Sequence, residues 1–169
     1  TTTSTTSTSL TTVPSTSTTS TTLSLFTLVQ TTSLSLKDDA TPPVNPAARR
    51  LSFKSSTKLD PQANRIAVPA PGGPGDPTLL GATVVVYNSG GLTTDDVEIT
   101  IPAGTGWSIL GSPSSFKGYR YKGTGAITGI TIKPDSLGVK GSKAAFGYTL
   151  DEPSQGRVAV RVILGGNVG

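Results

Sequence analysis

The stretch RVAVRVIL, residues 157–164, decides the fold class because its side chains alternate with a period of two. In an extended chain successive side chains point to opposite faces, so four apolar side chains share one face. These are Val158, Val160, Val162 and Leu164. Arg157 and Arg161 share the other face. This pattern predicts a β-strand with one buried face and one solvated face.

Several other short segments have a similar character. They are residues 50–56, 64–69 (an expected edge strand), 79–88 (an expected buried strand), 95–102, 116–123, 126–134 and 143–150. No window shows the apolar period of 3.6 residues that an amphipathic helix requires. With 20 Gly and 13 Pro, turn residues are abundant between the segments. Short strands at this spacing predict an all-β fold, a β-sandwich or jelly-roll-like domain of about ten strands.

The composition divides the chain into three parts. Residues 1–22 form a low-complexity segment rich in Thr and Ser, and residues 23–48 form an extended apolar segment with a Pro-rich connector. We expect the sandwich domain to span residues 49–169. Residues 33–38 alternate apolar and polar side chains, so they are a candidate for the first strand of that domain.

Twenty of the first 24 residues are Thr or Ser, with one Pro among them. Such a tract buries too little apolar surface to fold alone, and it is typical of O-glycosylated stalks. No Asn-x-Ser/Thr site is present, so any sugar is expected to be O-linked. A plain flexible linker is the other interpretation. The expected glycan sites are Thr1, Thr2, Thr3, Thr5, Thr6, Thr11, Thr12, Thr18 and Thr19.

The segment that follows this tract is apolar on both faces of an extended chain. Its large side chains are Leu23, Leu25, Phe26, Leu28 and Val29. An exposed strand of this kind would aggregate, so it must be covered on both sides. We therefore predict that residues 22–29 pack into a neighbouring copy of the chain. The expected partners are copies of itself in a polymer, with O-linked glycans as a second candidate partner.

The composition argues against enzymatic chemistry. The chain has no His, Cys or Met, so it lacks the usual general base, the thiolate nucleophile and the usual zinc ligands. Three acidic pairs, 38–39, 95–96 and 151–152, lack the spacing of a calcium loop. We expect no catalytic residue, no cofactor and no metal site.

The cluster FKGYRYKGTG, residues 116–125, interleaves aromatic and basic residues. On a regular strand Lys117 would share a face with the tyrosines, and Phe116 would point the other way. Trp107, Tyr119 and Tyr121 are therefore a candidate platform for a sugar ligand. The alternative interpretation is that these rings simply pack in the core.

The charge distribution suggests no nucleic-acid partner. The chain carries 14 Lys and Arg against 10 Asp and Glu, a net charge of +4, and no run of basic residues stands out. No stretch approaches the roughly 20 apolar residues of a membrane-spanning helix. We therefore expect neither nucleic-acid binding nor a membrane span.

Five segments between residues 33 and 164 carry a resemblance to known proteins. They are SLSLKDD (33–39), RRLSFKSS (49–56), GDPTLLGATVVVYN (75–88), IPAGTGW (101–107) and KGYRYKGTGAITGITIKP (117–134). They resemble predicted secreted bacterial proteins of unknown function, in which a Thr-rich linker precedes a compact β-domain. The apolar stretch LSLFTLVQ (23–30) departs from that group. The resemblance implies an extracellular or cell-surface β-domain and no catalytic residue.

Two functions remain open on these observations. The first is a structural subunit of an extracellular filament or surface lattice, assembled head-to-tail by addition of its N-terminal strand. The second is an extracellular binding module, an adhesin or a carbohydrate-binding domain on a glycosylated stalk.

Overall fold

The computed structural model describes residues 29–38, 45–57, 65–88, 97–112, 114–150 and 156–165. Within these ranges the chain forms nine strands, one short helix and two 3₁₀ turns. The strands are β1 (Thr31–Lys37), β2 (Arg50–Ser56), β3 (Ala82–Asn88), β4 (Val97–Ile101), β5 (Trp107–Ser112), β6 (Ser115–Lys122), β7 (Ile127–Lys133), β8 (Ser136–Ser142) and β9 (Val158–Leu164). The helix is α1 (Pro77–Leu80), and the 3₁₀ turns are η1 (Pro46–Ala48) and η2 (Ala144–Phe146). The predicted all-β fold is confirmed.

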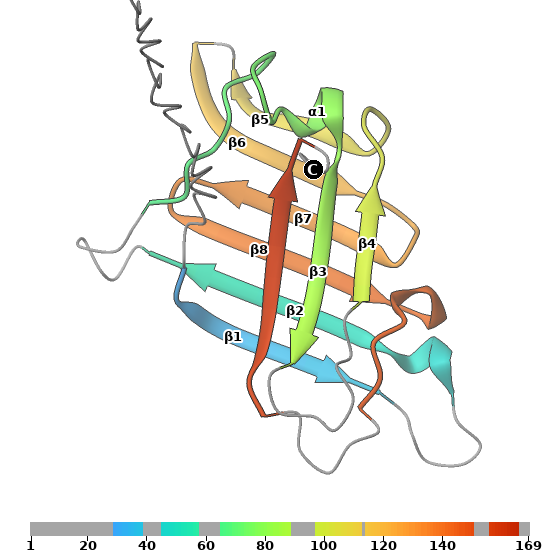
Figure 1. Cartoon of the computed structure of the whole chain (residues 1–169). Coiled ribbons are helices and arrows are strands. Elements are labelled where there is room, and N and C mark those ends of the chain that lie inside the picture. The colour runs from blue at the N-terminus through green and yellow to red at the C-terminus, as the bar shows by residue number, and fades with distance from the viewer. Residues whose placement is uncertain are drawn as a thin grey trace, which may run out of the picture.

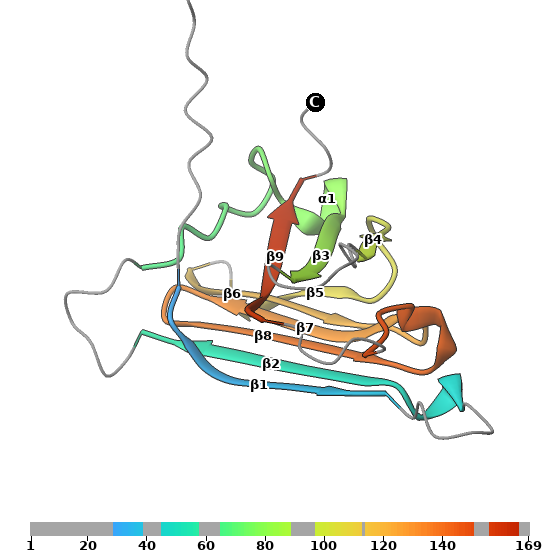
Figure 2. The same cartoon turned by 60° about the horizontal axis from the view of Figure 1, so that its bottom comes forward.

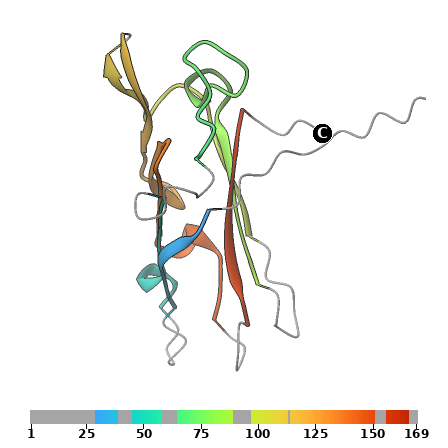
Figure 3. The ribbon, with the colours of Figure 1, turned by 90° about the vertical axis from the view of Figure 1, so that its left-hand side faces the viewer.

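The strands form two sheets of unequal size. The large sheet has six strands in the order β1-β2-β8-β7-β6-β5, and the small sheet has three in the order β4-β3-β9. All pairings are antiparallel. The sheets face each other, and their strands cross at a steep angle (Figures 1 and 3). This is a sandwich-like packing in which the small sheet covers the middle of the large one (Figure 2).

The core lies between the two sheets. Val84 and Val86 of β3 are completely buried above the large sheet, whose inner face contributes further side chains. These include Leu51, Phe53, Tyr119, Ile127, Ile130, Ile132 and Val139. The central strand β3 is buried along most of its length, which explains its nearly continuous apolar sequence.

Alternating patterns located several strands well. Leu51 and Phe53 of β2 are buried, and along β4 the exposed side chains alternate with more buried ones. In β9 the four side chains expected on one face all pack against the core. The segment 33–38 belongs to the domain, since β1 pairs with β2 at the edge of the large sheet.

Three expected strands are wrong in whole or in part. Residues 65–70 run without regular structure, and residues 144–146 form the 3₁₀ turn η2 instead of a strand. Residues 77–80 form α1 rather than the start of a strand, because the Asp76 carboxylate caps the helix by accepting from Thr78 N. β5 and β8 were not expected, because their Gly and Ser residues weaken the apolar signal.

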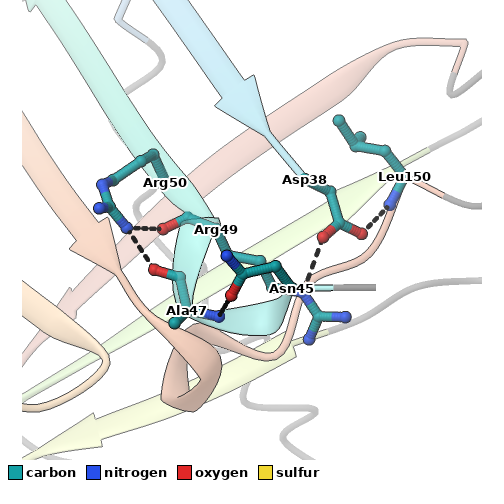
Figure 4. A network of polar contacts seen from close by, with 6 residues as sticks. All are labelled: Asp38, Asn45, Ala47, Arg49, Arg50 and Leu150. Atoms are coloured by element: carbon teal, nitrogen blue, oxygen red, sulfur yellow. Dashed lines mark hydrogen bonds and ion pairs between the residues drawn. The ribbon is translucent and has the colours of Figure 1, made fainter. Parts of the chain in front are cut away.

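A buried ion pair lies at one end of the large sheet, just after β1 and just before β2 (Figure 4). Arg49 Nε donates to Asp38 Oδ1 at 3.0 Å, and Leu150 N donates to Asp38 Oδ2 at 3.2 Å. Both carboxylate oxygens of Asp38 are therefore engaged, and the segment after η2 is tied to this end of the sheet. Nearby, the Asn45 side chain caps η1 by accepting from Ala47 N at 3.2 Å.

Among the described residues no helix is long and apolar enough to cross a membrane.

Candidate functional site

The aromatic platform is closed, which corrects the expectation for Trp107, Tyr119 and Tyr121. Tyr119 is 0% exposed and Trp107 is 9% exposed, and Tyr121 is half-buried against the core. The Trp107 and Tyr121 rings lie 5.1 Å apart between centroids and are tilted by 48°, so they form no coplanar surface. Trp107 Nε1 donates to Pro102 O at 3.1 Å. These rings pack in the core and leave no open sugar platform.

A β-bulge explains why the face of Phe116 was assigned wrongly. The register between β5 and β6 shifts between Leu110 and Gly111, so the strict alternation along β6 is interrupted. Phe116 therefore turns to the side of Tyr119, and the two rings meet edge-on with centroids 5.1 Å apart.

Tyr119 and Asp76 form a buried polar contact beneath the loop at residues 71–77. The Tyr119 hydroxyl donates to Pro69 O at 3.1 Å. Burial raises the pKa of Tyr119 to about 12, and the negative charge of Asp76 beside it adds to the shift. A tyrosine that stays protonated in the folded state favours folding fully below pH 10. That contribution is lost as the pH rises from 10 toward 12.

We expect Tyr119→Phe to reduce the loss of stability in alkali. The two-unit difference in pKa corresponds to about 2–3 kcal/mol of unfolding free energy that the wild type loses at high pH. Urea unfolding at pH 8, 10 and 11.5 measures it. Tyr87→Phe is the control, since Tyr87 is 38% exposed. An equal alkaline loss in the Tyr119→Phe and wild-type proteins would contradict the assignment.

The outer face of the large sheet gathers positive charge. The six strands of this sheet contain no Asp or Glu. They hold eight of the 14 basic residues, and the rest of the chain has six basic and all ten acidic residues, a net charge of −4. The eight are Lys37, Arg50, Lys54, Lys117, Arg120, Lys122, Lys133 and Lys140. None of them forms an ion pair with a described residue.

Four of these cations border a shallow trough of about 820 Å³ on the outer face. The strand register aligns Lys54 with Gly138, Gly138 with Thr131, and Thr131 with Arg120 across four neighbouring strands. A second row aligns Lys140 with Gly129 and Gly129 with Lys122. The middle of the trough is therefore lined by the small residues Gly129, Thr131 and Gly138, with cations on both sides.

Sequence reasoning missed this site because the four cations lie on three strands that are distant in the chain. β2 and β8 are neighbours in the sheet although more than 80 residues separate Lys54 from Lys140. The alternation of basic with apolar residues in each strand was the available signal. Only the strand order brings the separate signals onto one face.

A second feature is an apolar groove of about 610 Å³ along β9. This strand pairs with β3 on one side, and no described strand pairs with its other side. Six of its seven side chains are only half-buried. The groove is lined by β9 together with Val29, Phe53, Ile66, Ile132 and Leu137, among others. Among the described strands, β9 therefore forms an unpaired edge of the small sheet.

Most of the predicted interface and all of the predicted glycan sites fall outside the described residues. Of the five interface side chains only Val29 is described, and it is half-buried in the groove of its own chain beside β9. Leu23, Leu25, Phe26 and Leu28 lie outside the described ranges, as do the nine threonines named as glycan sites. Both assignments stay predictions.

Within the described ranges no group of three metal-ligating side chains is found.

No protein family model matches the sequence, and no curated protein or solved structure matches it significantly. The resemblance to secreted bacterial proteins therefore stays a prediction.

Proposed function

We propose that the protein is a structural subunit of an extracellular filament or surface lattice, in which residues 22–28 of one copy, the part of the predicted segment that precedes Val29, add to β9 of the next. The observation that carries the proposal is the open apolar edge of β9 described above. An added strand gains backbone hydrogen bonds from β9, and its alternate side chains enter the groove. A contact between two different surfaces does not close on itself, so it propagates a polymer.

The chemistry of the donor segment matches that of the groove. Leu23, Leu25, Phe26 and Leu28 are large and apolar, and residues 22–29 contain no charge. The groove offers Phe53, Ile66, Ile132 and Leu137 besides the apolar side chains of β9. Burying each large side chain contributes about 1.5–3 kcal/mol before association costs.

The double variant Phe26→Asp/Leu28→Asp tests this function in the full-length chain. We expect the wild-type protein to assemble, as seen by electron microscopy and light scattering. The variant should remain a folded monomer, because two carboxylates in an apolar groove lose their hydration without gaining partners. Circular dichroism confirms that the domain is folded.

The matched control is Ser15→Asp/Ser17→Asp, which adds the same charge at the same two-residue spacing outside the donor segment and should assemble normally. Strand addition between copies is refuted by either of two results. One is a wild-type chain that stays monomeric at high concentration. The other is a Phe26→Asp/Leu28→Asp chain that still forms full-length assemblies.

A second candidate function, an extracellular binding module, is favoured by a different observation. The basic trough lies on the outer face of the large sheet, and the small sheet packs on the opposite face. Strand addition at β9 would leave this trough open, so the two functions are compatible.

A further inference from the structure

We propose that the basic trough binds a linear anionic polysaccharide, lying parallel to the strands between a bank formed by Lys54 and Lys140 and a bank formed by Arg120 and Lys122. This inference rests on the second candidate function, the binding module, and is independent of strand addition at β9.

The spacing of the two banks suits one extended chain. Neighbouring strands lie about 4.8 Å apart, so Lys54 on β2 and Arg120 on β6 are separated by roughly 14 Å across the sheet. Lys140 and Lys122 are separated by roughly 10 Å on the same reasoning. Lysine and arginine side chains reach several ångströms inward from each bank. A single chain with acidic groups on both edges can therefore contact both banks at once.

The floor of the trough leaves room for a sugar chain and offers it polar groups. A Cβ added to Gly129 or Gly138 would meet its nearest atom at 3.7 Å or 3.8 Å, an ordinary van der Waals contact, so a group fits above both glycines without a clash. Thr131 lies between Gly138 and Arg120 in its row, and Ser56 pairs with Ser136 at one end of the trough, where the Ser136 hydroxyl donates to Asp135 Oδ1 at 3.1 Å. Hydroxyl groups of this kind exchange hydrogen bonds with sugar hydroxyls.

The charge pattern selects an acidic ligand. The six strands carry no Asp or Glu, so no acidic side chain lies between the two rows of cations. One carboxylate borders the trough at its Ser136 end, that of Asp135 in the turn between β7 and β8. Exposed cations with no described partner remain available to carboxylate or sulfate groups.

Two other acidic partners fit the surface less well. Single-stranded nucleic acids are held by aromatic side chains that stack on their bases. The rings of Phe53, Tyr119 and Trp107 are buried. Tyr121 borders the trough, but it is half-buried and its ring packs on Trp107 with centroids 5.1 Å apart. Membrane surfaces are bound by basic residues together with apolar side chains that insert among the lipids. The outward positions beside Lys54 and Lys140 hold Ser and Gly instead.

The test measures binding of polygalacturonate oligomers to the full-length protein by isothermal titration. We expect binding that weakens with added salt, because the contacts are exposed charges. Charge reversal in Lys54→Glu/Arg120→Glu should lower the affinity by at least about tenfold, since each bank changes from attraction to repulsion. Dextran, which is uncharged, should not bind.

The matched control is Arg65→Glu/Arg157→Glu, which makes the same change in net charge at two exposed residues outside the large sheet. It should keep the affinity within roughly threefold of the wild-type value, because such distant exposed charges are largely screened. A filled floor, in Gly129→Leu/Gly138→Leu, should weaken binding with all cations still present.

Three results would overturn the proposal. The first is an equal effect of the Lys54→Glu/Arg120→Glu pair and the control pair, which would mean that only net charge matters. The second is unchanged affinity after the floor is filled. The third is tighter binding of poly-dT or of anionic lipid vesicles than of polygalacturonate, which would assign the trough to a nucleic acid or to a membrane surface. None of these outcomes depends on whether the chain polymerises.

Discussion

Replacing Gly118 with alanine is expected to lower the free energy of unfolding by about 3 kcal/mol or more, the larger share coming from a clash inside the large sheet. Gly118 has φ of +127°, a conformation that residues with a side chain rarely adopt. A Cβ at this position would also run into the backbone carbonyl oxygen of Ile132 on the neighbouring strand β7. Backbone cannot move aside without separating β6 from β7.

Urea unfolding followed by circular dichroism measures the effect of Gly118→Ala. Gly125→Ala is the matched control, because a Cβ there meets no atom within 4 Å and Gly125 is not among the glycines with positive φ. Its stability should stay within about 0.5 kcal/mol of the wild-type value. Equal stability of the two variants would mean that the backbone of β7 does not approach Gly118 as closely as this structure has it.

The bulge in β6 beside Gly118 also marks the limit of what periodicity could predict. Strands that alternate without interruption, such as β4 and β9, were located from their side chains alone. In β6 the bulge moves Phe116 to the inner face. Strict alternation of side chains along the sequence cannot predict that shift. β5 and β8 escaped prediction because glycine and serine make up half or more of each strand and leave too few branched or aromatic side chains to indicate a strand.

The basic trough could not be predicted from the sequence for a different reason. The net charge of +4 does not indicate that the strands of the large sheet hold eight basic residues and no acidic one. The segregation appears only when the order β1-β2-β8-β7-β6-β5 is known. The apolar donor segment is the opposite case, because its residues are contiguous and its pattern is visible before any strand order is known.

The two proposed surfaces would reinforce each other in one assembly. The groove along β9 lies between the sheets, and the trough lies on the outer face of the large sheet. A polymer joined through β9 would therefore repeat the trough once in every subunit. Weak binding of an acidic polysaccharide at each trough would then add up through multivalency, by roughly 10²–10⁴-fold over a single site.

Asp76→Ala is expected to cost about 3–4 kcal/mol of unfolding free energy, because it removes a buried carboxylate that several donors share. Asp76 is 2% exposed. Its Oδ2 accepts from Gly72 N at 2.6 Å, and its Oδ1 accepts from Thr78 N at 2.8 Å and from Thr78 Oγ1 at 2.7 Å. Without the carboxylate the N–H of Gly72 and the N–H and hydroxyl of the half-buried Thr78 lose their partner, and the buried volume of the side chain is left unfilled. Asn45→Ala is the control, since that cap on η1 is exposed and should cost no more than about 1 kcal/mol.

The loss of unfolding free energy at acidic pH should depend on the same contacts of Asp76. Burial alone would raise the pKa of Asp76, but the hydrogen bonds from Gly72 and Thr78, together with the Tyr119 hydroxyl, outweigh it and lower the pKa below 3.8. A carboxyl group with a lowered folded-state pKa favours folding fully above 3.8, and this contribution is lost as the pH falls through the folded-state value. The wild type should therefore lose stability more steeply below pH 3.8 than Asp76→Ala does, in chemical unfolding at pH 6, 4 and 2.5. If both proteins lose the same free energy over that range, the carboxylate does not hold the loop above Tyr119 in the way described.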